Sequence, residues 1–188
     1  MDLPHGDDRT KKFVSCVGLI TSNGPYGDNI MACEWIHQVS YSPGIMMISV
    51  KTSRASYENI KQSKEFGISI ASTEQNTLSS LSGGSSAKVI DKINALKELG
   101  YKFYKAKKIN VLMVEDSALN IECKLMKEVV LGDYVLFLGE IIETKLGEKE
   151  PLAYHGGKYW KLENTIPKPE PEKLANLSKV LEKYRKKK

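Results

Sequence analysis

The order of strand and helix signals is the feature of this chain that most constrains its fold. Apolar, extended segments predict strands over residues 13–21, 30–35 and 45–51. Helix signals follow within residues 53–99, and alternating patterns between residues 118 and 144 then predict a long antiparallel hairpin. A doubly wound α/β fold would alternate strands and helices along the chain, and this sequence does not. We therefore predict a mainly β, α+β fold, in which an antiparallel barrel or sheet carries helices at its ends.

The length and composition are those of one ordinary globular domain. The chain has 188 residues, of which 41% are hydrophobic and 27% are charged. No apolar run approaches the roughly 20 residues that cross a bilayer, and the polar N-terminus lacks the apolar core of a signal peptide. We expect a cytoplasmic protein without a membrane partner.

The basic charge is concentrated at one end of the chain. The net charge is +5, but five positive charges lie within the last six residues, so residues 1–182 are close to neutral. A nucleic-acid-binding domain would need a basic face on its folded body, and aromatic residues are not interleaved with the basic ones here. We therefore expect no nucleic-acid partner.

The three cysteines give no sign of a disulfide framework or a metal site. Cys16, Cys33 and Cys123 are far apart and form no CxxC pair. The three histidines likewise lack metal-ligand spacing. Buried, unpaired thiols and the absence of a metal are the expectation.

A change in composition after residue 165 predicts two parts. Residues 1–165 form the predicted domain, and residues 166–188 combine a proline-spaced linker with an amphipathic, basic C-terminal helix. The apolar stripe of that helix must be covered either by its own barrel or by a partner chain. Its members are Leu174, Leu177, Val180, Leu181 and Tyr184.

The junction after the strand at 45–51 is a candidate anion site. A helix with Ser53 as its predicted cap would begin there, and a helix N-terminus offers free N–H groups and a positive dipole end. Lys51, Arg54 and Ser56 add two cations and a hydroxyl within one turn, a combination that suits a phosphate monoester. A solvated helix start with ordinary surface lysines explains the same residues, and their types alone leave both readings open.

Two further segments contain candidate ligand-binding groups. Residues 82–86, two glycines among serines, are predicted to open a helix that carries Lys92, which suits an anion. They lack the ending of a P-loop, and a flexible surface loop is the alternative. His155 precedes two glycines on a predicted loop, where an imidazole can donate to a ligand or act as an acid.

Several of these segments resemble the flavin reductase-like family, which includes flavoredoxins and archaeal ferric reductases. The resemblance covers roughly residues 10–162, and the combination of motifs is more specific than any one of them. The matching motifs are Asn29-Ile30-Met31-Ala32-Cys33-Glu34-Trp35, Ile48-Ser49-Val50-Lys51 with Arg54-Ala55-Ser56, Glu65-Phe66-Gly67-Ile68, Ser82-Gly83, Asp91-Lys92, Gly132-Asp133 and Pro151-Leu152 with Tyr154-His155-Gly156-Gly157.

This resemblance implies an FMN-binding split β-barrel that works as a homodimer, with each flavin near the subunit interface. Asn29, Met31 and Ala32 would line the isoalloxazine ring and ribityl chain, and His155 would approach the flavin as the candidate catalytic residue. The phosphate side would be held by Ser49, Lys51, Arg54, Ser56, Ser82 and Lys92. The backbone neighbours Ile30 and Val50 complete the implied cofactor-binding set.

Two positions depart from the family pattern. Tyr134 follows Gly132-Asp133 where many relatives carry histidine, which leaves the role of this position open. Pro43 is followed by Gly44 where a second proline is frequent, and this loosens the backbone beside the expected flavin.

The resemblance implies an oxidoreductase that passes electrons from NADH or NADPH through FMN to free flavin, a ferric chelate or a protein acceptor. The sequence has no GxGxxG fingerprint, so a nicotinamide would dock only transiently over the flavin. The alternative is a flavoredoxin-like FMN electron carrier that is reduced by a protein donor and has no NAD(P)H activity of its own.

Overall fold

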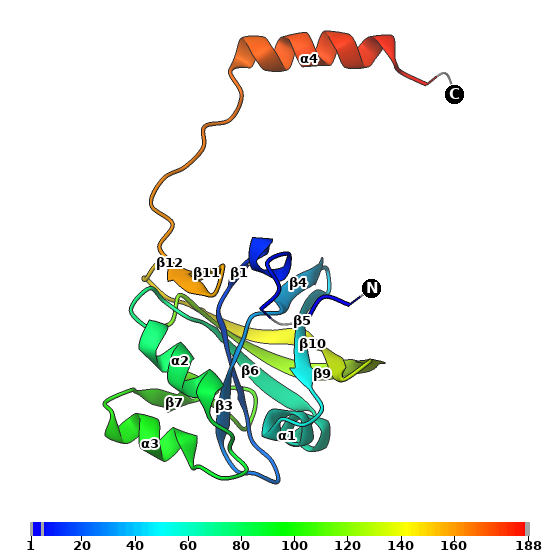
Figure 1. Cartoon of the computed structure of the whole chain (residues 1–188). Coiled ribbons are helices and arrows are strands. Elements are labelled where there is room, and N and C mark those ends of the chain that lie inside the picture. The colour runs from blue at the N-terminus through cyan, green and yellow to red at the C-terminus, as the bar shows by residue number, and fades with distance from the viewer. Residues whose placement is uncertain (1, 5, 187–188) are drawn as a thin grey trace.

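The computed structural model describes residues 2–4 and 6–186. Its body is built on a seven-stranded antiparallel sheet in the order β3-β2-β6-β9-β10-β5-β4 (Figure 1). A small sheet, β1-β11-β12, and a two-stranded ribbon, β7-β8, complete the β structure. The elements are η1 (Thr10–Lys12), β1 (Val14–Cys16), β2 (Gly18–Ser22), β3 (Asn29–Cys33), β4 (Ile36–Tyr41), β5 (Gly44–Lys51), α1 (Ala55–Ser63), β6 (Glu65–Ile70), α2 (Asn76–Gly84), α3 (Lys92–Glu98), β7 (Phe103–Lys105), β8 (Leu112–Val114), β9 (Leu119–Leu131), β10 (Tyr134–Leu146), β11 (Ala153–His155), β12 (Lys158–Trp160) and α4 (Pro171–Lys183).

The large sheet curls into a barrel around one hydrophobic core. Cys33 from the β3 edge packs in the same buried cluster as Ile36 from the β4 edge, and Phe66 and Phe137 come from the central strands. A Cβ atom at Gly18 of β2 would lie only 2.6 Å from Ile36 Cδ1. Glycine is therefore needed where the two halves of the barrel approach each other. The predicted mainly β fold with helices at the barrel ends is confirmed.

The strand predictions held where alternation was strong. The long hairpin is β9 and β10, joined at Gly132, whose φ is +59°. The predicted strand over 13–21 is divided at Val17, because β1 pairs with β11 while β2 enters the barrel. Strand β4 was not predicted, since five of its six side chains lie on the surface side or are half-buried and show no period of two.

The helices begin at other residues than the sequence predicted. Arg54, not Ser53, precedes α1, and no side chain caps that helix. The pair Gly83-Gly84 ends α2 and does not open the next helix. Helix α3 begins after the predicted segment 82–86 and is capped by Asp91, whose carboxylate accepts a hydrogen bond of 3.0 Å from the N–H of Asn94.

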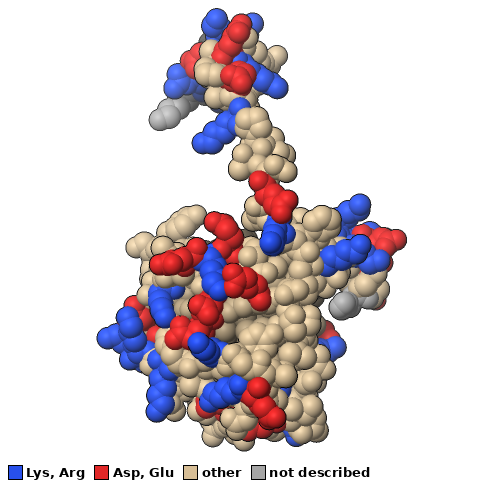
Figure 2. Space-filling view, turned by 90° about the vertical axis from the view of Figure 1, so that its left-hand side faces the viewer, with Lys and Arg blue, Asp and Glu red and all other residues tan. Residues whose placement is uncertain are grey.

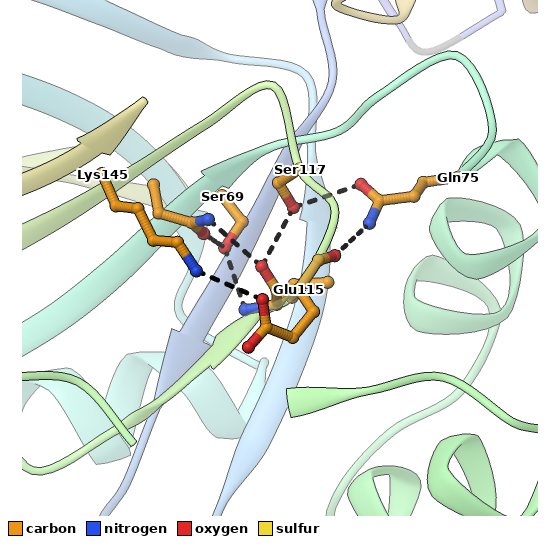
Figure 3. A network of polar contacts seen from close by, with 7 residues as sticks. Ser69, Gln75, Glu115, Ser117 and Lys145 are labelled. Carbon is orange, nitrogen blue, oxygen red and sulfur yellow. Dashed lines mark hydrogen bonds and ion pairs between the residues drawn. The ribbon is translucent and has the colours of Figure 1, made fainter. Parts of the chain in front are cut away.

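A polar network fixes the start of α2 against the barrel (Figure 3). Gln75 Nε2 donates to the carbonyl of Glu115 at 2.7 Å, and Ser117 Oγ donates to Gln75 Oε1 at 3.2 Å. Lys145 forms an ion pair of 3.3 Å with the Glu115 carboxylate, and Ser69 bonds to the neighbouring strand through Asn120 Oδ1. The network holds one end of α2, and it therefore determines where the other end lies.

The C-terminal helix lies apart from the barrel (Figure 1). Residues 161–170 have no regular structure and are exposed, and every residue of α4 is exposed as well. The stripe predicted for this helix is present but uncovered. Among the described residues, no helix is long and apolar enough to cross a membrane. The boundary at residue 165 stays a prediction.

Candidate functional site

Three helix ends meet around strand β3 and gather most of the predicted site residues. Ser56 lies in the first turn of α1, Ser82 in the last turn of α2, and Lys92 is the first residue of α3. Ser56 bonds to Asn29 at the start of β3, and Lys92 bonds both to the Ile30 carbonyl of β3 and to the Ser82 carbonyl. Segments that are up to 62 positions apart in sequence form one cluster here.

This cluster contains two buried polar atoms that have no hydrogen-bond partner within the described chain. Asn29 Nδ2 donates to Ser56 Oγ at 2.8 Å, but Asn29 Oδ1 is left unpaired, as is Ser82 Oγ. An unpaired buried polar group costs about 1–3 kcal/mol, and a bound ligand is one of the partners that can offset this cost. FMN carries ribityl hydroxyls that can donate to Asn29 Oδ1 and oxygens that can accept from Ser82 Oγ. The residues present therefore fit the group that the resemblance implies.

Lys92 is buried and bound to main-chain carbonyls. Its Nζ donates to the carbonyl of Ile30, and to those of Ser82 and Ser85 at 3.2 Å each. An ammonium group has three N–H donors, so these three acceptors use all of them. Burial, and to a smaller extent the positive charge of Arg54, together lower the pKa of Lys92 to about 8. In this geometry Lys92 ties β3 to the end of α2, and a direct bond to phosphate would require it to release a carbonyl.

Arg54 and the start of α1 form the cationic side of the cluster. The Arg54 side chain is exposed, and the residue has an extended backbone with φ −81° and ψ 145° before the first helical turn. The first N–H groups of a helix have no carbonyl partner within it, and the dipole end is positive. An anion can therefore be bound here by N–H groups and a guanidinium together.

Lys51 is directed elsewhere. It forms an ion pair of 3.1 Å with Asp133 in the β9–β10 turn and lies 5.9 Å from the centre of the Tyr134 ring. Tyr134 in turn contacts Trp35, with ring centroids 5.1 Å apart. Tyr134 is thus part of an aromatic pair on the outside of the barrel.

The remaining predicted residues differ in what they can present to a ligand. The side chains of Ile30 and Val50 are fully buried in hydrophobic clusters, so only their backbone can face a ligand. Met31 and Ala32 are half-buried, and a Cβ at Gly83 would lie 3.4 Å from Ala32 Cβ, so α2 packs closely on β3. Ser49 is buried, and its N–H donates to the Trp35 carbonyl at 3.0 Å.

His155 is not joined to this cluster by a contact of the described residues. It ends β11 in the small sheet, where its Nδ1 lies 3.2 Å from the Phe13 carbonyl and its ring centroid is 6.3 Å from that of Trp160. The small sheet does reach α2, because the Tyr159 hydroxyl bonds to Ser79 Oγ at 3.1 Å. A catalytic role for His155 stays a prediction.

The sequence analysis missed two residues that shape the site. Asn59 is buried in α1, where its Nδ2 donates to the Gly27 carbonyl at 2.9 Å and its Oδ1 accepts from the N–H of Tyr26 at 3.0 Å. It thereby holds the turn that leads into β3. The signal was an asparagine in the middle of a helix, a residue of low helix propensity. Ser85 lies in the predicted candidate segment 82–86, but the bond from Lys92 to its carbonyl was not predicted.

Comparison with known proteins agrees with this architecture. The NADH-dependent FMN reductase AsuE2 of Streptomyces nodosus subsp. asukaensis is 27% identical over 128 residues, 67% of this chain and 66% of that protein. The structure of the flavin reductase PheA2 has a TM-score of 0.72 and 28% identity, covering 87% of this chain and all of the other. The fold is shared with a flavoredoxin from Methanosarcina acetivorans, with a TM-score of 0.78, 18% identity, and coverage of 94% and 99%.

The family assignment rests on most of the chain. Residues 10–163 match the family described as the flavin reductase like domain. This range contains the barrel, the three helix ends around β3 and the small sheet with His155, and it excludes α4. The chain belongs to the flavin reductase-like family.

Proposed function

We propose that the protein binds FMN in the cluster around β3 and works as a flavin reductase-type oxidoreductase. The observation that carries this proposal is the pair of unpaired, buried polar atoms around β3: Asn29 Oδ1, whose side chain bonds to Ser56 in α1, and Ser82 Oγ, at the end of α2. The family assignment and the name of the relative AsuE2, an NADH-dependent FMN reductase, support it.

Each element around β3 has a part in holding the cofactor. Asn29 and Ser82 bind the ribityl chain, and Arg54 with the first N–H groups of α1 binds the phosphate. Met31 and Ala32 lie along the ring. Lys92 acts through the backbone, because it fixes the carbonyls that set the spacing of β3 and α2. When bound, FMN supplies the capacity to accept a hydride and to release electrons singly or in pairs.

The donor in this proposal is NADH or NADPH, which docks transiently, and the acceptor is free flavin, a ferric chelate or a protein. Side-chain acids and bases are not needed for hydride arrival at a flavin, so the chain's role is binding, orientation and exclusion of water. His155 is a candidate to donate a hydrogen bond from the small sheet. We propose that the protein works in the cytoplasm.

We further propose that the protein works as a homodimer through the outer face of β5 and β10. Because Ile48 and Phe137 point into the core, the alternating positions on these strands point outward. Met47 and Leu138 are paired directly across the two strands on this outer face, and both are half-buried. The Trp35 and Tyr134 rings contact each other at the end of this face, and exposed apolar groups of this kind are often covered by a partner.

An anaerobic visible spectrum tests the function. The protein is reconstituted with FMN, gel-filtered, and recorded before and after NADH or NADPH is added. We expect flavin bands that survive filtration and bleach within seconds. Bands that survive without bleaching, together with rapid reduction by a protein donor, would support an electron carrier instead. Loss of all flavin on filtration would contradict tight FMN binding.

A further inference from the structure

The net charge of the chain resides entirely in α4 and the residues after it. Seven of the 28 Lys and Arg residues, but only two of the 23 Asp and Glu residues, lie in 171–188. This segment therefore carries +5, and residues 1–170 carry no net charge. On the face shown in Figure 2, acidic and basic side chains of the body are intermingled. An anionic partner would be attracted to the appendage and not to the barrel.

Helix α4 also presents an uncovered apolar stripe beside this charge. Its apolar side chains recur three and four positions apart, so they lie on one side of the helix. All of them are exposed, from 46% for Leu174 to 81% for Tyr184. The linker at 161–170 has ten residues, enough to span about 30 Å when extended, so α4 can lie flat on a surface while the barrel stays clear of it.

A second α4 is a poor cover for this stripe. As a coiled-coil seam, Leu174, Leu177, Leu181 and Tyr184 make only two heptads, whereas stable pairing takes three to four. The flanking positions hold Lys173, Ser178, Val180 and Arg185, which offer no pair of opposite charges across such a seam. Two basic tails would also repel each other.

We propose that α4 with its basic tail is an amphipathic anchor that binds the surface of an anionic lipid bilayer. The stripe would enter the boundary between headgroups and acyl chains, and the lysines would lie among the anionic headgroups. A bilayer adapts to any sufficiently amphipathic helix, whereas a groove on an acidic protein must match the stripe in shape. This inference is independent of FMN binding, and it revises the expectation of no membrane partner, which rested on the lack of a spanning segment.

Vesicle flotation of the full chain tests the anchor, with phosphatidylcholine vesicles compared with vesicles that also contain phosphatidylglycerol. We expect flotation with the anionic vesicles only, weakened by added salt. The double variant Leu177→Asp/Leu181→Asp should lower the partition coefficient at least about tenfold. The matched control, Leu162→Asp/Ile166→Asp, adds the same charge at exposed linker positions and should lower it much less.

Three results would overturn the proposal. The first is the absence of flotation with anionic vesicles. The second is an equal loss in both double variants, which would mean that charge alone binds. The third is a wild-type oligomer in sedimentation equilibrium that dissociates on Leu177→Asp/Leu181→Asp, which would show a second copy on the stripe. An unchanged melting temperature of the barrel in both variants verifies that the fold is intact.

Discussion

Replacing Lys92 with methionine tests two opposing effects of its buried ammonium group. One is the cost of burying the charge, and the other is the stabilisation by its hydrogen bonds. Methionine is unbranched and one atom shorter than lysine, and it removes the charge and three hydrogen bonds to carbonyls. Burial lowers the pKa of Lys92 from 10.5 to about 8, which corresponds to about 3 kcal/mol against the charged form in the folded state. Losing the bonded carbonyl partners costs a similar amount, so we expect a change in unfolding free energy of less than about 2 kcal/mol at pH 7.

The pH dependence of stability gives the sharper test. Below pH 8 both the folded and the unfolded chain hold the Lys92 proton, and the penalty is constant. Between pH 8 and 10.5 the unfolded chain binds more protons than the folded one, so this group makes stability rise with pH. From pH 7.5 to 9.5 the wild type should gain about 2 kcal/mol over Lys92→Met, because the other titrating groups cancel in the difference.

Urea unfolding of both proteins at the two pH values measures this gain, and Lys92→Arg is the conservative control. The guanidinium does not titrate in this range, so the arginine variant should follow Lys92→Met in pH dependence. FMN affinity should fall about five- to thirtyfold in Lys92→Met, since misplacing the ends of β3 and α2 loses about 1–2 kcal/mol of contacts. A stability difference that is the same at pH 7.5 and 9.5 would refute the argument that burial perturbs Lys92.

Three more changes have expected outcomes. Arg54→Ala should weaken FMN binding roughly five- to tenfold in a fluorescence titration, because it removes an exposed charge beside the proposed phosphate site. An unchanged dissociation constant would show that Arg54 does not bind the phosphate. The buried carboxylate of Glu122 accepts hydrogen bonds of 2.8 and 2.7 Å from the N–H groups of residues 107 and 108. Glu122→Ala should therefore lower the unfolding free energy, measured by urea unfolding, by about 2–3 kcal/mol. A loss under ~0.5 kcal/mol would contradict this. Burial raises the thiol pKa of Cys33 and of Cys123 to about 12. Neither thiol should therefore react with a thiol reagent at pH 8 until the protein unfolds. Rapid labelling of both in the native protein would count against their burial.

The sequence predicted what depends on local pattern. The β9–β10 hairpin was found because apolar alternation is strong along both strands and a turn with glycine in a left-handed conformation joins them. Strand β4 and the break at Val17 were not found, since both are decided by which partner strand is adjacent. An exposed edge strand such as β4 shows no alternation of apolar and polar residues, and a change from one sheet to another at Val17 leaves no pattern in the sequence.

The candidate site was predictable in its residue types but not in its connections. Asn29, Ser56 and Ser82 were chosen for their family positions and chemistry, and the structure brings them together around β3. The family resemblance implied that Lys92 binds the phosphate. Its carbonyl partners belong to a strand 62 positions away and to the end of α2, and no local pattern encodes that geometry.

The arrangement of Lys92 also explains why a cationic site can be assembled without strong repulsion. Arg54 and Lys92 are close enough for the charge of one to lower the pKa of the other, yet Lys92 is neutralised locally by three carbonyl dipoles. Two of those carbonyls, of Ser82 and Ser85, lie at the C-terminal end of α2, which is the negative end of the helix dipole. The dipole of α2 thus stabilises Lys92, while the positive end of α1 and the exposed Arg54 remain available to an anion. A binding site that used both cations directly would leave the end of α2 unpaired, and the division of roles between Lys92 and Arg54 avoids that cost.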